Sequence, residues 1–182
     1  METNYTDCGI YKYVCDFVLE NIKIHQLIDV AKECVFCGTN SKNLLILAGL
    51  SEKFDAWDTI LRYYKLTLDE LNIKEPNKKE AAIYLTNYYC KELVDKKISP
   101  EIFLEKIGRE IYYKSVFEYD NKITGDSIGI ENLLTLYYSI DELNEIESYY
   151  INEGNNKNCE HEKLKLYNEC YKEAEEYLKI GL

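Results

Sequence analysis

The chain has 182 residues, with 22 basic and 33 acidic side chains, so its formal net charge at pH 7 is −11. Apolar residues make up 46% of it, which is enough to bury a core and excludes wholesale disorder. So acidic a surface repels phosphates, which excludes non-specific binding to nucleic acid or to an anionic membrane. The sequence contains neither an apolar run of about 18 residues nor the basic and apolar regions of a signal peptide. It therefore predicts a cytoplasmic protein without a membrane span.

The length favours one domain over residues 1–182, and the dominant pattern within it is helical. Apolar residues recur at spacings of three and four, which is typical of amphipathic helices. The pattern predicts helices near residues 11–19, 24–37, 43–50, 55–71, 77–97, 99–111, 130–143 and 158–178. By its period alone, 43–50 also fits a buried strand, but no second strand is available to pair with it, so a helix is favoured.

Start and stop signals support several of these helices. Gly38 closes the second one as a C-terminal cap. Asn77 and Glu80 form the pattern of a capping box, and Ser99-Pro100 combines a serine cap with a proline at the first helical position. Loops are expected at 119–129 and 154–156. The sequence thus predicts an all-α fold: an antiparallel helical bundle or a short stack of helix pairs, with about seven to nine helices.

The seven cysteines suit reduced and mostly buried thiols in a cytosolic protein. Cys34 and Cys37 form one CxxC pair, but no thioredoxin-like strand precedes it, and whether these thiols are reactive stays open. A zinc site would need two more ligands. Cys159 and His161 are the candidates, yet two residues apart on a helix they face different directions. We expect no metal and no cofactor.

No motif for a phosphate loop, a nucleophilic serine or a metalloprotease is present, and the chain has only two histidines. An enzyme would have to use carboxylates or a thiol, and with 33 acidic residues the pairing of carboxylates is uninformative. The sequence therefore predicts a protein that is not an enzyme. An enzyme with an unrecognised carboxylate or thiol site remains an alternative.

The acidic residues are concentrated in one part of the chain. Residues 115–154 contain nine acidic residues against Lys122 alone, for a net charge of −8, whereas residues 71–114 contain nine basic and seven acidic ones, for +2. Tyrosines interleave with these acids, as they do on surfaces that bind Lys/Arg-rich proteins. A solvated face that only keeps the protein soluble is the alternative. The predicted partner-binding residues are Glu131, Tyr137, Tyr138, Asp141, Glu142, Glu145, Glu147, Tyr149 and Tyr150.

Three short segments add a resemblance. The apolar run 44–50, the helix start at Glu80-Ala81-Ala82 and the turn Lys97-Ile98-Ser99-Pro100 resemble small all-α bacterial proteins of the immunity, or toxin-neutralising, type. At Lys96 or Lys97 those proteins often carry a glycine. The resemblance implies neutralisation of a toxin by protein–protein interaction and no catalytic residue.

Charge and resemblance lead to the same expectation: an acidic protein that blocks a basic toxin. A nuclease fits this role because its active-site cleft must be basic to hold phosphates. An anionic mimic of nucleic acid that inhibits a DNA-binding protein is the alternative that uses the same charge. It would place its acidic residues along one continuous surface.

Overall fold

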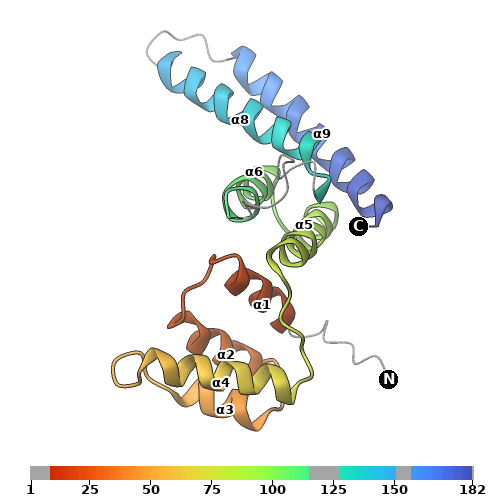
Figure 1. Ribbon diagram of the computed structural model, residues 1–182. Coiled ribbons are helices and arrows are strands. Elements are labelled where there is room, and N and C mark those ends of the chain that lie inside the picture. Colours follow the sequence, from red (N-terminus) through yellow and green to blue (C-terminus); the bar gives the residue numbers. More distant parts are fainter. Residues whose placement is uncertain (1–8, 115–127, 151–156, 182) are drawn as a thin grey trace. The chain divides into compact units, whose positions relative to one another are not determined.

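The computed structural model describes the backbone of residues 9–114, 128–150 and 157–181, and the side chains of all these except 148–150 and 157–158. Within this part of the chain there are eight α-helices, one π-helical segment and no strand, which confirms the all-α prediction (Figure 1). The predicted loop at 119–129 lies outside the described residues up to position 127, as does all of the loop at 154–156.

The chain divides into two compact units, Met1–Ala81 and Ala82–Leu182. The second unit carries 12 basic and 20 acidic residues, a net charge of −8, whereas the first carries 10 and 13, a net charge of −3. Most of the acidity therefore belongs to the second unit. The single domain expected from the length stays a prediction.

The first unit contains four helices and the start of a fifth. They are α1 (Ile10–Val18), α2 (Gln26–Phe36), α3 (Lys42–Gly49), α4 (Trp57–Glu70) and the first residues of α5 (Lys78–Val94). The central helix is α3, which packs against both α2 and α4. The run 43–50 is thus a helix rather than a strand, as favoured from the sequence.

The predicted cap at Gly38 is present as a Schellman motif at the end of α2. Gly38 has a φ of 92°, in the left-handed region where glycine is favoured. Its N–H donates to Val35 O at 2.9 Å, and the N–H of Thr39 donates to Cys34 O at 3.0 Å. These two bonds satisfy carbonyls that a helix end leaves without partners, and they stop α2 where the sequence indicated.

The N-terminus of α3 is capped from another helix. The Ser41 hydroxyl accepts from Leu44 N–H, and the carboxylate of Glu70, the last residue of α4, accepts from Lys42 N–H at 2.8 Å and from Asn43 N–H at 2.9 Å. Hydrogen bonds from the backbone of Asn43 and Lys42, then from Ser41, lower the pKa of Glu70 to about 2. A carboxylate is well placed there because the free N–H groups and the helix dipole both favour negative charge.

This cap predicts a pH-dependent contribution to stability. Because the pKa of Glu70 in the folded state lies below its usual 4.5, the contribution is complete above about pH 4.5 and disappears as the pH falls towards 2. Glu70→Gln should therefore lower the melting temperature at pH 7, and its difference from the wild type should close between about pH 4.5 and 2. Circular dichroism melts over this range check it, with Asp69→Asn as the neighbouring charge-matched control. A difference that stays constant with pH would contradict the prediction.

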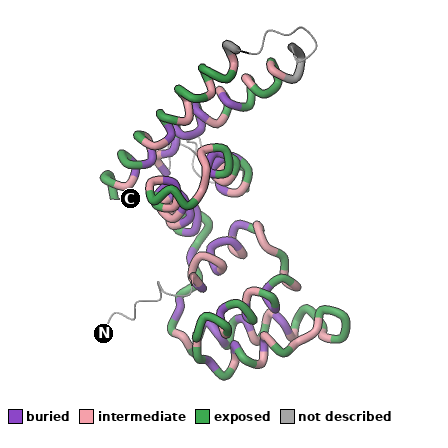
Figure 2. Tube along the Cα trace, turned by 180° about the vertical axis from the view of Figure 1, so that it is seen from behind, coloured by how far each residue is buried: buried purple, intermediate pink, exposed green. Residues whose placement is uncertain are grey.

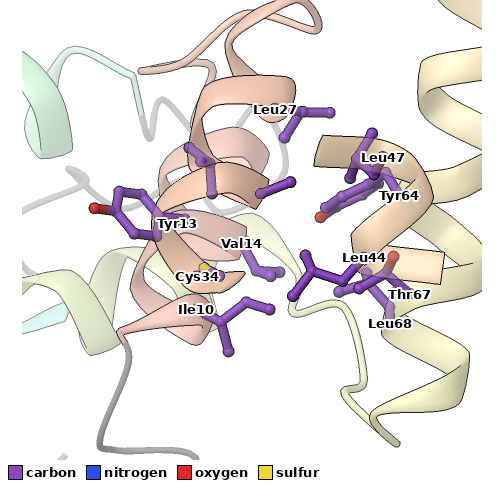
Figure 3. Close-up of a pocket in the computed structure, with 12 residues that line it drawn as sticks. Ile10, Tyr13, Val14, Leu27, Cys34, Leu44, Leu47, Tyr64, Thr67 and Leu68 are labelled. Atoms are coloured by element: carbon purple, nitrogen blue, oxygen red, sulfur yellow. The ribbon is translucent and has the colours of Figure 1, made fainter. Parts of the chain in front are cut away.

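The core of the first unit is formed by one face of each helix. Fully buried residues include Val14, Leu27, Ala31, Leu47 and Ile60. The side chains converge on a cavity of about 20 Å³ with a mainly apolar lining (Figure 3). Such a volume holds about one water molecule, so this cavity is a packing defect rather than a ligand site.

Trp57 marks a limit of the helical pattern in the first unit. Trp57 falls on the apolar stripe of its helix, but its side chain is 64% exposed. The reason is its position: Trp57 is the first residue of α4, and the packed face begins one turn later, at Ile60, and continues through Tyr64 and Leu68. An apolar stripe in the sequence shows which side of a helix packs, but it does not show at which residue the packing against a neighbouring helix begins.

The helix α5 begins with the predicted capping box. Asn77 Oδ1 accepts from Glu80 N–H, and Glu80 Oε2 accepts from Asn77 N–H, both at 2.9 Å. The rest of the second unit follows as α6 (Pro100–Glu105), the π-helical segment η1 (Lys106–Tyr112), α8 (Glu131–Tyr150) and α9 (Lys157–Ile180). Ser99 caps α6 by accepting from Ile102 N–H, with Pro100 at the first helical position as predicted.

In the second unit, α8 and α9 form an antiparallel hairpin that packs against α6 (Figure 1). Each helix turns one face inward, as the burial pattern shows (Figure 2). From α9, the buried Tyr177 hydroxyl donates to Ile128 O at 3.0 Å and bonds the Thr86 side chain of α5. The change from α to π geometry at Lys106 was not predicted, because the apolar spacing there suits an ordinary helix.

Candidate protein-binding surface

The predicted acidic residues of α8 fall on two sides of the helix. Glu131, Tyr138, Glu142 and Glu145 follow one another at steps of seven, four and three residues, so they share one side of the helix. All four side chains are exposed, Tyr138 by 44%. We call these four residues the outer stripe. Asp141, also exposed, lies one turn from both Tyr138 and Glu145, at the edge of the stripe.

Two predicted residues face elsewhere, and two have no described side chain. Glu147 pairs with Lys163 of α9, and both side chains are largely buried in the hairpin. Tyr137 is half-buried, and its ring lies against Gly108 of η1. The side chains of Tyr149 and Tyr150 lie outside the described residues. Of the predicted residues, the structure therefore leaves Glu131, Tyr138, Asp141, Glu142 and Glu145 exposed along one side of α8.

A cluster of tyrosines borders the outer stripe. The rings of Tyr112 and Tyr138 meet edge to face with centroids 6.4 Å apart, and Tyr113 and Tyr137 each contact one of these two rings at 5.3 Å. A hydrogen bond that the Tyr138 hydroxyl donates to the Tyr113 side chain, followed by partial burial, raises the pKa of Tyr138, so its hydroxyl is protonated at neutral pH. Tyr113 and Tyr138 remain about half exposed and give the stripe an aromatic margin.

Beside Asp141 the surface is hollowed into a groove of about 220 Å³. Three segments of the second unit form it: α6, η1 and α8. The lining residues are Glu101, Leu104, Glu105, Arg109, Tyr137, Ile140, Asp141 and Asn144. Three carboxylates face one guanidinium, so the groove keeps a net negative charge.

The charged side chains of the groove interact with one another. Arg109 forms an ion pair with Glu105 at 3.1 Å. A hydrogen bond with Tyr137, then the charges of Glu105 and, further down, Asp141, raise the pKa of Arg109. Arg109 therefore stays charged and neutralises only part of the local negative charge.

Glu101, which also lines the groove, is held in the ionised form. Burial raises its pKa, but hydrogen bonds from Ser99, from its own backbone N–H and from Tyr167, together with the charge of Lys163, outweigh burial, so the pKa is lowered overall. On the other side of this contact, burial followed by the charge of Glu101 raises the pKa of Tyr167 to about 12. The groove is negative at neutral pH.

The cysteine thiols and the possible metal ligands were the other candidates for a functional site in the described part of the chain. Burial raises the pKa of the Cys15, Cys90 and Cys170 thiols to about 12, so they are protonated and poor nucleophiles at neutral pH. In the CxxC pair, Cys34 is buried in the core and Cys37 is exposed. No group of three or more His, Cys, Asp or Glu side chains among the described residues is arranged to hold a metal ion.

Comparisons with protein-family models, with curated proteins and with solved structures find no match to this chain. None of the helices in the described ranges combines the length and the apolar character that crossing a bilayer requires.

Sequence reasoning missed the other wall of the groove. Glu101, Glu105 and Arg109 lie 22 to 30 positions before the start of α8, in a region whose charges nearly balance, so no local excess marked them. Their i,i+4 spacing was visible, but it predicts only an ion pair along one helix. The outer stripe could have been predicted from the sequence. Counting about 3.6 residues per turn from Glu131 places Tyr138, Glu142 and Glu145 on the same side of the helix. The same count places Tyr137 and Glu147 on other sides.

Proposed function

We propose that this chain is an acidic binding protein that neutralises a basic partner protein, in the manner of an immunity protein that blocks a toxin. A nuclease is the kind of toxin that fits best, because its substrate-binding cleft must carry positive charge. No step of this function requires a catalytic residue or a cofactor from this chain. The partner is held by protein–protein contacts alone.

The observation that carries the proposal is the outer stripe. Three carboxylates, Glu131, Glu142 and Glu145, are exposed along one side of α8, with Tyr138 among them. Acidic side chains on one face repel each other, and a basic partner relieves that repulsion while it accelerates encounter. Exposed tyrosines add contact area and a hydrogen bond, as binding surfaces require.

Mimicry of nucleic acid is supported less well. Glu131 and Glu145 are 14 positions apart, which spans about 21 Å along an α-helix. Over that length the stripe and Asp141 supply four carboxylates, whereas duplex DNA carries about 12 phosphate charges on its two strands, of which about six lie on any one face. The charge on this face is therefore sparser than that of a DNA surface. It suits a protein partner that also contacts the aromatic margin.

The test is a charge reversal of the stripe. Glu131→Lys, Glu142→Lys and Glu145→Lys, combined in one variant, should weaken the complex with the basic partner by about ten- to a hundredfold and flatten its dependence on salt. The partner is first captured on the full chain at low salt, identified by mass spectrometry and purified. Affinity is then measured by calorimetry at several salt concentrations. If the partner is a nuclease, inhibition of its cleavage of nucleic acid should be lost in parallel.

A matched control separates the stripe from total charge. Reversing the exposed Glu160, Glu175 and Glu176 to lysine changes the net charge of the same unit by the same amount, but on α9. We expect this control to lose less than about threefold in affinity. Equal losses in both variants, or none in the stripe variant while circular dichroism shows both folded, would contradict the proposal.

A further inference from the structure

The groove beside the outer stripe has the size of a single side chain. Its volume of about 220 Å³ lies below the roughly 300–1,000 Å³ of sites that enclose small-molecule ligands. Its floor contains the apolar side chains of Leu104 and Ile140 and the half-buried Tyr137, and its margins carry carboxylates. A long side chain with an apolar stem and a positive head matches both parts.

The charges of the groove are not balanced from within the chain. Arg109 pairs with Glu105, but both side chains are more than half exposed, so this pair is weak and open to exchange. Asp141 lies on the opposite margin. Its carboxylate forms no hydrogen bond or ion pair with a side chain in the described part of the chain, and its interaction with Arg109 is a longer-range electrostatic attraction. A second cation in the groove would therefore find a carboxylate available.

We propose that this groove receives an arginine side chain from the basic partner. This proposal rests on the function proposed above and specifies the contact that anchors the partner. The arginine stem packs on Leu104 and Ile140, and its guanidinium lies between Asp141 and Glu105. The planar guanidinium can bond both carboxylates and stack on the Tyr137 ring, whereas the ammonium of lysine acts as a point charge. The groove thus selects arginine over lysine.

The chain offers a closely matched pair of variants. Asp141→Asn and Glu175→Gln each remove one negative charge from an exposed position of the second unit, but only Asp141 lines the groove, and Glu175 lies on α9 outside the outer stripe. The probes are two five-residue peptides with lysine at both ends, glycine at the second and fourth positions, and either arginine or lysine in the centre. Both peptides carry the same charge. Each is titrated into the isotope-labelled full chain at low salt and followed by NMR.

The arginine peptide should bind at least threefold more tightly than the lysine peptide and shift the amide signals of Leu104, Arg109 and Asn144. Asp141→Asn should weaken the arginine peptide by about tenfold and abolish the preference, whereas Glu175→Gln should change its affinity by less than twofold. Equal affinities of the two peptides, equal effects of the two variants, or shifts confined to other surfaces would overturn the groove assignment.

The two proposals fail separately. If the purified basic partner loses affinity with the stripe reversal but not with Asp141→Asn, the groove assignment is wrong while the proposed function stands. If the arginine peptide binds in the groove but the stripe reversal leaves partner affinity unchanged, the proposed function is wrong, and only the arginine-binding property of the groove stands.

Discussion

Replacing Phe103 with alanine is expected to lower the free energy of unfolding by about 3–5 kcal/mol. Phe103, in α6, is 0% exposed and the largest of the fully buried side chains. Its removal loses the transfer free energy of the ring and leaves a cavity that the helices around it can close only in part. Denaturation in urea, followed by circular dichroism, measures the difference.

The neighbouring residue provides the control for this experiment. Ile102 is also apolar and lies in the same helix, but it is 47% exposed. Ile102→Ala should cost less than about 1 kcal/mol, since little of its surface is removed from water on folding. Similar losses for the two variants would show that α6 is not packed as described.

The second large effect is expected at Gly108 in η1. A Cβ at this position would lie 2.6 Å from two ring atoms of Tyr137, well inside van der Waals contact. Helix propensity alone would favour alanine over glycine by about 1 kcal/mol. The overlap with the Tyr137 ring reverses that sign, and Gly108→Ala should destabilise the protein by about 1–3 kcal/mol. Urea denaturation is again the measurement.

A double-mutant cycle isolates the cause. In a Tyr137→Ala background the ring is gone, so Gly108→Ala should become neutral or slightly stabilising. The coupling between the two positions should then be about 1–3 kcal/mol. Additive effects would mean that the loss comes from the π-helical backbone and not from the contact with the ring.

Local signals account for the parts of the fold that the sequence predicts well. The capping box of Asn77 and Glu80, the serine cap at Ser99 and the glycine at position 38 each depend on residues within a few positions, and the structure contains all three. The division at Ala81 could not be predicted, because it depends on which helices pack together across the chain. The spacing of apolar residues shows which face of a helix is buried, but it does not show which other helix packs against that face.

The candidate surface shows the same limit. Composition located the acidic part of the chain correctly, because charge is read directly from the residues. It could not tell that Tyr137 packs on Gly108 or that Glu147 pairs with Lys163, since each contact joins two elements. The groove is defined by such contacts alone, between α6, η1 and α8, and it appears only once the helices are assembled.

The cap that Glu70 provides for α3 has a consequence for the order of folding. α3 has eight residues, fewer than the roughly 12–15 that an isolated helix needs to persist in water. Its first free N–H groups are satisfied by a carboxylate 27–28 positions later in the chain. We therefore expect nascent α3 to be only a transient turn until the end of α4 has been synthesised and has docked. During synthesis, the first unit is then expected to complete its central helix only after residue 70 has left the ribosome.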